Sequence, residues 1–327
     1  MKKIILLFLL LILLSACNNA QIDEKKASIF KQYEIALPAG MELPYDLSTM
    51  NDGTIYIAGF NKDWTTGTLW KMDNKEWKKI FNFTDSIPVN MEAHKEKEAS
   101  VFILSENQLL YTLSLIQDNG VIKDFYYVIK DNKATKLSIQ LPLLQGNYTN
   151  GILIAKRYNS NSFIIEDLTG QLFLIDNQTG KTIQNFTTKN WVNDFAIYND
   201  NLYALTDNGI ETLSIKTGVA TDPCSSIKYL EKSLITPKST KSTKFMKQRI
   251  TIDKDETSKK ICTFYIGDEG LKYSTENATK TLLKKKNTFL SDKSAFIYDF
   301  ERYKNNYYAI ALNEKGSHIF HYTNDEL

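Results

Sequence analysis

The segment DFAIYNDNLYALTDNGIETLSI, residues 194–215, decides how this chain is expected to fold. Its three apolar runs are separated by Asn199-Asp200-Asn201 and by Asp207-Asn208-Gly209, residue types that tolerate the positive φ angles of tight turns. The pattern predicts antiparallel strands over residues 194–198, 202–205 and 210–215, with a fourth strand somewhere after Gly218. A four-stranded antiparallel unit is therefore the expected building block.

Apolar runs of this kind recur six times along the chain. They are centred on Tyr56, Phe102, Ile164, Tyr203, Phe264 and Tyr308, which gives gaps of 46, 62, 39, 61 and 44 residues. The mean gap is about 50 residues, the period of β-propeller blades. The runs do not alternate with polar residues, so both faces of each strand must be covered. We predict an all-β fold, a six-bladed β-propeller, with seven blades or a pair of β-sandwiches as alternatives.

A matching phrase opens three of the expected innermost strands. The aspartates of Asp46-Leu47, Asp194-Phe195 and Asp299-Phe300 stand nine or ten residues before the central tyrosine of the apolar run that follows. With its turns and apolar runs, this phrase resembles the degenerate repeats of bacterial propellers of the YVTN, NHL and quinoprotein-like kind. The resemblance extends over the whole mature domain and implies a propeller over residues 29–327.

The two ends of the domain are expected to meet. Only three strands can be found near the C-terminus, over residues 298–303, 307–312 and 317–323. Residues 29–35, which precede the first repeat, are expected to form a strand without a partner of its own. Pairing this N-terminal strand with the last repeat would supply its missing outer strand and remove an exposed edge.

The N-terminus has the three parts of an export signal. Lys2 and Lys3 precede an apolar run from Ile4 to Leu14, which is too short to span a bilayer as a helix, and small residues follow. Leu14-Ser15-Ala16-Cys17 resembles the lipobox of bacterial lipoproteins. The resemblance implies cleavage of residues 1–16, diacylglyceryl attachment to Cys17 and anchoring on the extracytoplasmic side of the cell membrane. The polar residues 17–28 are expected to be a flexible tether.

The composition excludes several functions. The chain has 40 basic and 38 acidic residues, and loss of Lys2 and Lys3 leaves equal numbers, which argues against nucleic-acid binding. Besides Cys17 only Cys224 and Cys262 remain, so one disulfide or two free thiols are possible, and the free thiols are favoured. Cysteine and histidine do not occur at metal-binding spacings, and nucleophile elbows, P-loops and dinucleotide-binding turns are missing.

Residues near the entry to each innermost strand are the candidate ligand-binding residues, because these loops meet on one face of a propeller. They are Asp46, Asn90, Asp194 and Asp299, the aromatic residues Tyr45, Trp191 and Tyr298, and Trp64 from a loop between the second and third strands. Carboxylates and aromatic rings at a concave opening suit a sugar, an amine or a cation. The alternative is that each aspartate caps a turn and its neighbour packs in the core.

Two further groups of residues receive weaker hypotheses. Glu92 and His94 could share one face of a strand, although they are expected to be lining residues more than an acid and base pair. A lysine-rich stretch could attract anionic lipid or wall polymer, although such stretches are more often solvated loops; its members are Lys232, Lys238, Lys241, Lys244 and Lys247.

The leading functional hypothesis is a non-enzymatic, membrane-anchored propeller that binds a protein or an envelope glycan through its loop face and needs no cofactor. The first alternative is a divalent-metal-dependent hydrolase or lactonase, with Ca²⁺ held by Asp46, Asn90, Glu92, Asp194 and Asp299. The second is a structural subunit of an envelope assembly.

Overall fold

The structure is a computed structural model of the whole chain. It describes residues 31–50, 52–83, 96–116, 122–141, 151–206, 209–221, 248–254, 259–267, 270–274, 279–284, 296–303 and 306–323. Side chains are described for most of these residues, but not for the residues between 248 and 284. Every element in the described ranges is a β-strand, as the short, turn-bounded apolar runs predicted.

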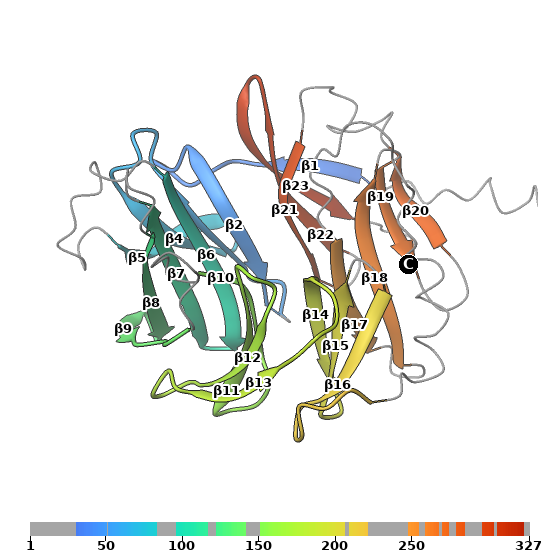
Figure 1. Cartoon of the computed structure of the whole chain (residues 1–327). Coiled ribbons are helices and arrows are strands. Elements are labelled where there is room, and N and C mark those ends of the chain that lie inside the picture. The colour runs from blue at the N-terminus through green and yellow to red at the C-terminus, as the bar shows by residue number, and fades with distance from the viewer. Residues whose placement is uncertain are drawn as a thin grey trace, which may run out of the picture.

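The strands form six antiparallel sheets in which chain order and spatial order agree, except at the last sheet (Figure 1). The first sheet is β2 (Leu43–Thr49), β3 (Ile55–Phe60), β4 (Gly67–Asp73) and β5 (Glu76–Asn82), and the second is β6 (Glu96–Ser105), β7 (Gln108–Ile116), β8 (Ile122–Lys130) and β9 (Lys133–Leu137). The third is β10 (Ile152–Arg157), β11 (Ser162–Asp167), β12 (Leu172–Asp176) and β13 (Thr182–Phe186), and the fourth is β14 (Val192–Tyr198), β15 (Asn201–Thr206) and β16 (Gly209–Ser214). The fifth is β17 (Gln248–Lys254), β18 (Lys259–Gly267), β19 (Gly270–Ser274) and β20 (Thr279–Lys284), and the last is β21 (Phe296–Tyr303), β22 (Asn306–Asn313), β23 (Gly316–Thr323) and β1 (Lys31–Ile35).

The first strands of successive sheets lie next to one another. Contacts run from β21 to β2, and on through β6, β10 and β14 to β17, so these strands follow one another around a common axis. This arrangement of radially placed antiparallel sheets is that of a β-propeller. Tight turns with positive φ angles join the strands, at Asn199 and Asp200 for example, where the sequence predicted a turn.

The predicted number of blades is wrong. Five sheets are complete four-stranded blades, whereas the fourth sheet has three strands in the described part of the chain. After Gly218 the structure describes three further residues, up to 221, and these make an isolated bridge between Leu213 and Ala220 where the fourth strand was expected. In the sequence Pro223 follows closely, and a proline cannot donate a hydrogen bond to a strand ladder. The structure therefore has five blades and a shorter sheet, and neither six nor seven blades.

The predicted pairing of the two chain ends is confirmed. Strand β1 is the outermost strand of the last sheet and runs antiparallel to β23, from Lys31 opposite Thr323 to Ile35 opposite Ile319. Ile35 also packs against a buried cluster that joins the first and last sheets, which includes Met41, Leu47 and Ile310. Hydrogen bonds and apolar contacts thus both hold the N-terminal strand in place.

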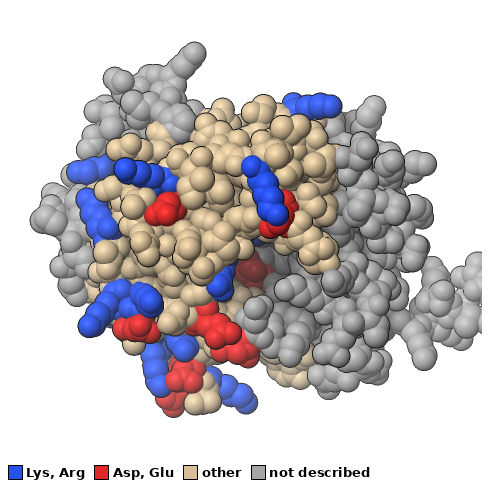
Figure 2. Space-filling model, turned by 90° about the horizontal axis from the view of Figure 1, so that it is seen from below, with Lys and Arg blue, Asp and Glu red and all other residues tan. Residues whose placement is uncertain are grey.

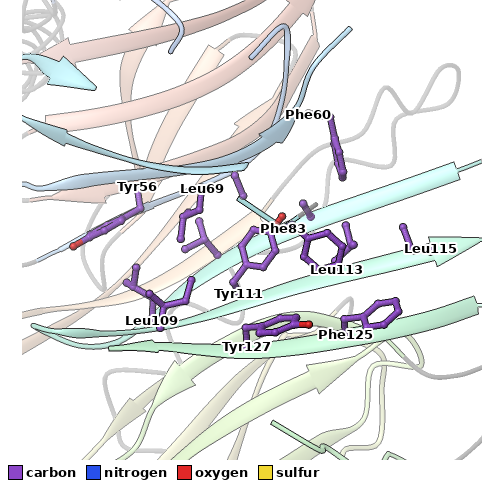
Figure 3. Close-up of a cluster of buried hydrophobic side chains, with 14 of the residues drawn as sticks. Tyr56, Phe60, Leu69, Phe83, Leu109, Tyr111, Leu113, Leu115, Phe125 and Tyr127 are labelled. Carbon is purple, nitrogen blue, oxygen red and sulfur yellow. The ribbon is translucent and has the colours of Figure 1, made fainter. Parts of the chain in front are cut away.

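Neighbouring sheets pack through large side chains, many of them aromatic (Figure 3). Between the first and second sheets, Phe83 lies 6.0 Å from Tyr111, 5.8 Å from Phe125 and 5.9 Å from Tyr127, measured between ring centroids. Phe83 and Tyr111 are fully buried. Aromatic rings therefore form much of the core at this boundary.

Candidate functional site

Each of the three predicted aspartates in the first strands follows a β-bulge. The pairing register shifts between Pro44 and Asp46 in β2, between Val192 and Asp194 in β14, and between Ile297 and Asp299 in β21. A bulge inserts one unpaired residue and turns the strand locally. The Asp-Leu and Asp-Phe phrases of the sequence therefore mark a shared backbone irregularity.

Two of these carboxylates hold adjacent sheets together. Asp299 Oδ2 accepts a hydrogen bond of 3.0 Å from the backbone N–H of Leu47, and Asp46 Oδ2 accepts one of 2.7 Å from the N–H of Val101. The Ser48 hydroxyl donates to the carbonyl of the same Val101, at 2.6 Å. Side chains of β21 and β2 thus satisfy backbone groups of the next sheet, as buried polar groups require.

Asp194 is engaged in a different way, with the preceding sheet. Its side chain is fully buried, and its Oδ1 lies 2.7 Å from Nζ of Lys156 in β10. Lys156 also donates to the carbonyl of Phe195, and its ammonium lies 5.3 Å from the centroid of the Phe195 ring. The ion pair balances a charge that would be costly to bury alone. No repeat in the sequence marked Lys156 as this partner.

These geometries give Asp46, Asp194 and Asp299 a structural role between sheets. Asp46 is 8% exposed, and Asp194 and Asp299 are 0% exposed, so none of the three lines an open surface. Among the described residues, no group of three or more His, Cys, Asp and Glu side chains is arranged to hold a metal ion.

Asn90, Glu92 and His94 lie outside the described residues, as do Cys224 and the lysine-rich stretch. The side chains of Tyr298 and Cys262 are not described either.

The structure brings together two of the predicted aromatic residues. The centroids of Tyr45 and Trp64 are 6.4 Å apart, and Trp64 packs on Phe60 at 5.1 Å. Trp64 has a φ angle of 57°, in the turn between β3 and β4. Trp191 is 48% exposed and lies over Gly170, at the entry to β14. The structure places Trp191 with the third and fourth sheets, and the other two residues in the first sheet.

The two C-terminal histidines have separate surroundings. Nδ1 of His318 lies 2.7 Å from Glu34 of β1, whereas Nε2 of His321 lies 2.7 Å from Oδ1 of Asn306. The ring of His321 stacks on Tyr308 at 4.6 Å. The two rings therefore have different hydrogen-bond partners.

An open groove lies on the face of the molecule where turns join the first and second strands of each sheet. We call this side the A–B face; the C-terminal ends of β2 and β6 point towards it, downwards in Figure 1. The inner part of the groove has a volume of about 610 Å³, typical of ligand sites. It is lined by Thr49, Met50, Asp52, Ile103, Leu104, Ser105, Glu106 and Arg157, from the first three sheets.

The groove combines an apolar floor with charges of both signs. Met50 and Leu104 are buried, whereas Asp52, Glu106 and Arg157 are exposed. Arg157 donates from Nε to the carbonyl of Asn159 at 3.2 Å. Its terminal guanidinium nitrogens, and the carboxylate of Glu106, make no hydrogen bond or ion pair with any other residue that the structure describes. Both side chains are exposed in the lining of the groove.

Asp52 adds a second negative charge that is fixed in orientation. Its Oδ1 accepts a 2.8 Å hydrogen bond from the backbone N–H of Thr54. This bond is the main reason why the pKa of the Asp52 carboxyl lies below its ordinary value, since it stabilises the ionised form. Asp52 therefore stays negatively charged under physiological conditions.

The groove continues outwards between the first and second sheets. A smaller pocket of about 210 Å³ shares Glu106 with the inner part and also contains Lys71, Asn107 and Asp131. Figure 2 shows the A–B face from below, with acidic and basic side chains intermingled. The two pockets therefore adjoin at Glu106.

A polar network fixes the neighbouring turns on this face. The Tyr158 hydroxyl donates to Oδ1 of Asp200 at 2.9 Å, and Nζ of Lys216 lies 2.6 Å from Oδ2 of the same residue. The hydrogen bond from Lys216 is the largest cause of the lowered pKa of Asp200. This network ties the end of the third sheet, which carries Arg157, to the fourth.

Comparison with known proteins identifies the N-terminal segment of the chain. Residues 1–18, which include Cys17, match the family model for the prokaryotic membrane lipoprotein lipid attachment site. The chain is therefore a lipoprotein with a β-propeller domain. In the described residues there is no helix whose length and hydrophobicity would allow it to cross a membrane.

Two solved structures illustrate similar propellers. Virginiamycin B lyase from Staphylococcus aureus is 13% identical, with 90% of this chain and 99% of that chain covered and a TM-score of 0.48. The WD40 β-propeller domain of Doa1 is 13% identical, with 91% and 98% covered and a TM-score of 0.45. No curated protein matches the sequence. At these identities neither structure assigns an activity or a ligand to this chain.

Proposed function

We propose that this protein is a binding lipoprotein, anchored on the extracytoplasmic side of the membrane, that holds a segment of a partner protein in the groove of the A–B face. The observation that carries the proposal is the pair of available charges, Glu106 and Arg157, beside the buried apolar floor of Met50 and Leu104. The export signal and the acylated Cys17 support the extracytoplasmic location.

The composition of the groove favours a protein segment over a glycan. Sugars usually bind in proteins by stacking on exposed aromatic rings, with hydrogen bonds around them. Among the described residues that line the two pockets, the only aromatic residue is Tyr56, which is 6% exposed and lies beneath Lys71. A peptide with a basic and an acidic side chain could pair with Glu106 and Arg157 and place an apolar side chain on the floor.

The rigidity of the site also suits binding. The turns that carry the charges are fixed by local hydrogen bonds, such as that from Thr54 to Asp52, and by the packed sheets behind them. A preorganised site loses little entropy when a ligand binds. We propose binding without catalysis; among the described groove residues, the Ser105 hydroxyl donates to Oδ1 of Asn107, an amide oxygen that cannot act as a general base.

The proposal is tested with the full-length lipoprotein in detergent micelles and fluorescein-labelled octapeptides of equal apolar content. Four peptides carry alternating Lys and Asp, only Lys, only Asp, or uncharged Ser at the same positions, and fluorescence anisotropy gives the Kd of each. We expect the mixed-charge peptide to bind most tightly. Arg157→Gln and Glu106→Gln should each weaken it about fivefold, which corresponds to roughly 1 kcal/mol for an exposed charge pair.

The two variants should differ in which peptides they affect. Arg157→Gln should abolish the preference for Asp-containing peptides, and Glu106→Gln the preference for Lys-containing peptides. The matched control removes Lys75 and Glu76 together, by Lys75→Gln and Glu76→Gln, in an exposed turn outside the groove lining. The proposal fails if both groove variants bind the four peptides as the control does.

A further inference from the structure

An exposed tryptophan lies at the end of β14 that is away from the A–B face. Trp191 immediately precedes Val192, the first residue of β14, whereas the turn on the A–B face follows Tyr198, the last. Among the described residues, the exposed large hydrophobic side chains include two aromatic ones, Trp191 at 48% and Tyr33 at 47%. A tryptophan combines a large apolar surface with a hydrogen-bond donor, which makes it a frequent contact residue in binding sites.

The indole ring of Trp191 rests with one face on a glycine. A Cβ atom added to Gly170 would lie 3.1 Å from Cδ2 and 3.3 Å from Cε2 of Trp191. These two atoms form the bond that the two rings of the indole share, so Gly170 approaches the ring over its face and not from its edge. Since the backbone of Gly170 covers one face and nearly half of the residue is exposed, the opposite face is open to solvent.

The loop that carries Trp191 is fixed by Glu211 of β16. Oε2 of Glu211 accepts a hydrogen bond from the backbone N–H of Lys189 at 2.8 Å. Its Oε1 accepts from the backbone N–H of Asn190 at 3.1 Å and from the side-chain amide of the same residue at 2.9 Å. The ring is therefore held in one position before a ligand arrives, which lowers the entropic cost of binding.

Polar groups surround this flat apolar ring. The indole N–H of Trp191 donates to no residue that the structure describes. Two exposed polar side chains adjoin the ring in sequence, Gln171 after Gly170 and Lys189 two residues before Trp191. A pyranose ring with equatorial hydroxyls has the matching shape, because its C–H groups form a flat apolar face and its hydroxyls point outwards from the rim.

We propose that Trp191 is a stacking platform for a pyranose ring of an envelope glycan, at a second binding site separate from the groove. The groove lacks an exposed aromatic ring, which argues against a sugar there, and the same criterion favours a sugar at Trp191. The lipid attachment site is consistent with a ligand in the cell envelope. This proposal does not depend on peptide binding in the groove.

Fluorine NMR of the full-length lipoprotein, labelled with fluorotryptophan, tests whether a sugar contacts this ring. The protein is kept in micelles of a detergent without a sugar headgroup and titrated with chitotetraose or cellotetraose, with the linear polyol sorbitol as the control. The signal of Trp191, assigned by its absence in Trp191→Phe, should shift and saturate with a tetrasaccharide and stay in place with sorbitol. The signals of the other tryptophans should not shift; these are Trp64, Trp70 and Trp77.

Variants measured by isothermal titration with the same tetrasaccharides separate stacking from other causes. Trp191→Ala should weaken binding at least about tenfold, and Trp191→Phe, which keeps a ring, only about threefold. The matched control is Tyr33→Ala, which removes an equally exposed ring from β1 and should change the Kd less than about twofold. The proposal is overturned if neither tetrasaccharide binds, or if Trp191→Ala binds as tightly as Tyr33→Ala.

The remaining measurements distinguish this site from a bilayer contact and from the groove. Quenching of Trp191 fluorescence by brominated phosphatidylcholine in vesicles, without binding of either sugar, would identify a membrane contact and overturn the proposal. Glu106→Gln and Arg157→Gln should leave sugar binding unchanged, and Trp191→Ala should leave peptide binding unchanged. Failure of one site therefore does not imply failure of the other.

Discussion

The carboxylate of Asp299 accepts a hydrogen bond from the backbone N–H of Leu47, 252 residues earlier in the chain, at 3.0 Å. Both residues are buried, Asp299 at 0% and Leu47 at 1% exposure. The bond joins the last sheet to the first, where β1 also joins the two chain ends. A side chain thus satisfies a backbone group at the junction on which closure of the propeller depends.

Removal of the Asp299 carboxylate should destabilise the domain. Asp299→Ala leaves the buried N–H of Leu47 without this acceptor, at an expected cost of about 2 to 3 kcal/mol in the free energy of unfolding. Asp299→Asn keeps an acceptor oxygen and should cost less. Urea unfolding measures the difference, and Asp63→Ala, an exposed aspartate, is the control, with an expected change within about 0.5 kcal/mol. Equal stability of the Asp299→Ala and Asp63→Ala proteins would refute the structural role.

The ion pair between Lys156 and Asp194 should show strong coupling. Lys156→Met leaves the buried carboxylate of Asp194 without its cation, and we expect a loss of about 3 kcal/mol. Adding Asp194→Asn to this variant removes the uncompensated charge and should recover part of the loss. A double-mutant cycle on thermal or urea unfolding gives the coupling energy. Strict additivity of the two changes would mean that the pair makes no net contribution.

Tyr111 offers a substitution that should stabilise the protein. Its ring is fully buried between the first and second sheets, and its hydroxyl makes no hydrogen bond with any residue that the structure describes. Tyr111→Phe keeps the aromatic contacts with Phe83 and Phe81 and removes a polar group that is costly to bury. We expect a gain of about 1 kcal/mol by urea unfolding. A loss of that size would show that the hydroxyl has a partner.

Stability should fall steeply in alkali. Burial raises the pKa values of Tyr111, Tyr126 and Tyr322 above the ordinary value of 10. Above pH 10 the unfolded chain loses these protons and the folded chain keeps them, so stability present below pH 10 is lost as the pH rises. Each tyrosine should contribute a loss of about 1.4 kcal/mol per pH unit.

Absorbance at the tyrosinate wavelength follows this transition directly. We expect the buried tyrosines to ionise together with the loss of circular dichroism, in one cooperative step. Tyr111→Phe should reduce the slope of the free energy of unfolding against pH by about the contribution of one tyrosine. Gradual ionisation of all tyrosines near pH 10, with the fold intact, would contradict the burial that the structure shows.

The strand pattern of this protein was predictable from local sequence. The strands of the fourth and last sheets lie within about two residues of their predicted bounds, because turn residues such as Asn199 and Asp200 mark where each strand ends. The pairing of the N-terminal strand was also predictable, since one repeat lacked a strand and residues 29–35 had no other partner. The three-stranded form of the fourth sheet, in the part of the chain that the structure describes, was not predictable. In the sequence, the turn at Gly218 resembles one that leads into a further strand.

The candidate site was not predictable in the same way. An aspartate before an apolar residue has the same local sequence pattern whether its side chain lines an opening or bonds to the next sheet. For Asp46 and Asp299, the bulge and the position of the neighbouring sheet determine that the carboxylate bonds to the next sheet. The groove combines turns from three sheets, and about 50 residues separate Asp52 from Glu106 and Glu106 from Arg157. No local periodicity marks such a set, and only the packing of the sheets brings it together.

The register of β1 on β23 supports the closure of the propeller by its N-terminal strand, so it is the most direct point to test. Cysteines are introduced by Lys31→Cys and Thr323→Cys, whose Cα atoms are register partners, with Cys224 and Cys262 replaced by serine. Mass spectrometry after mild oxidation should find one intramolecular disulfide between the two positions, with native circular dichroism and increased stability towards urea. Absence of this disulfide, or its formation only between molecules, would contradict the account.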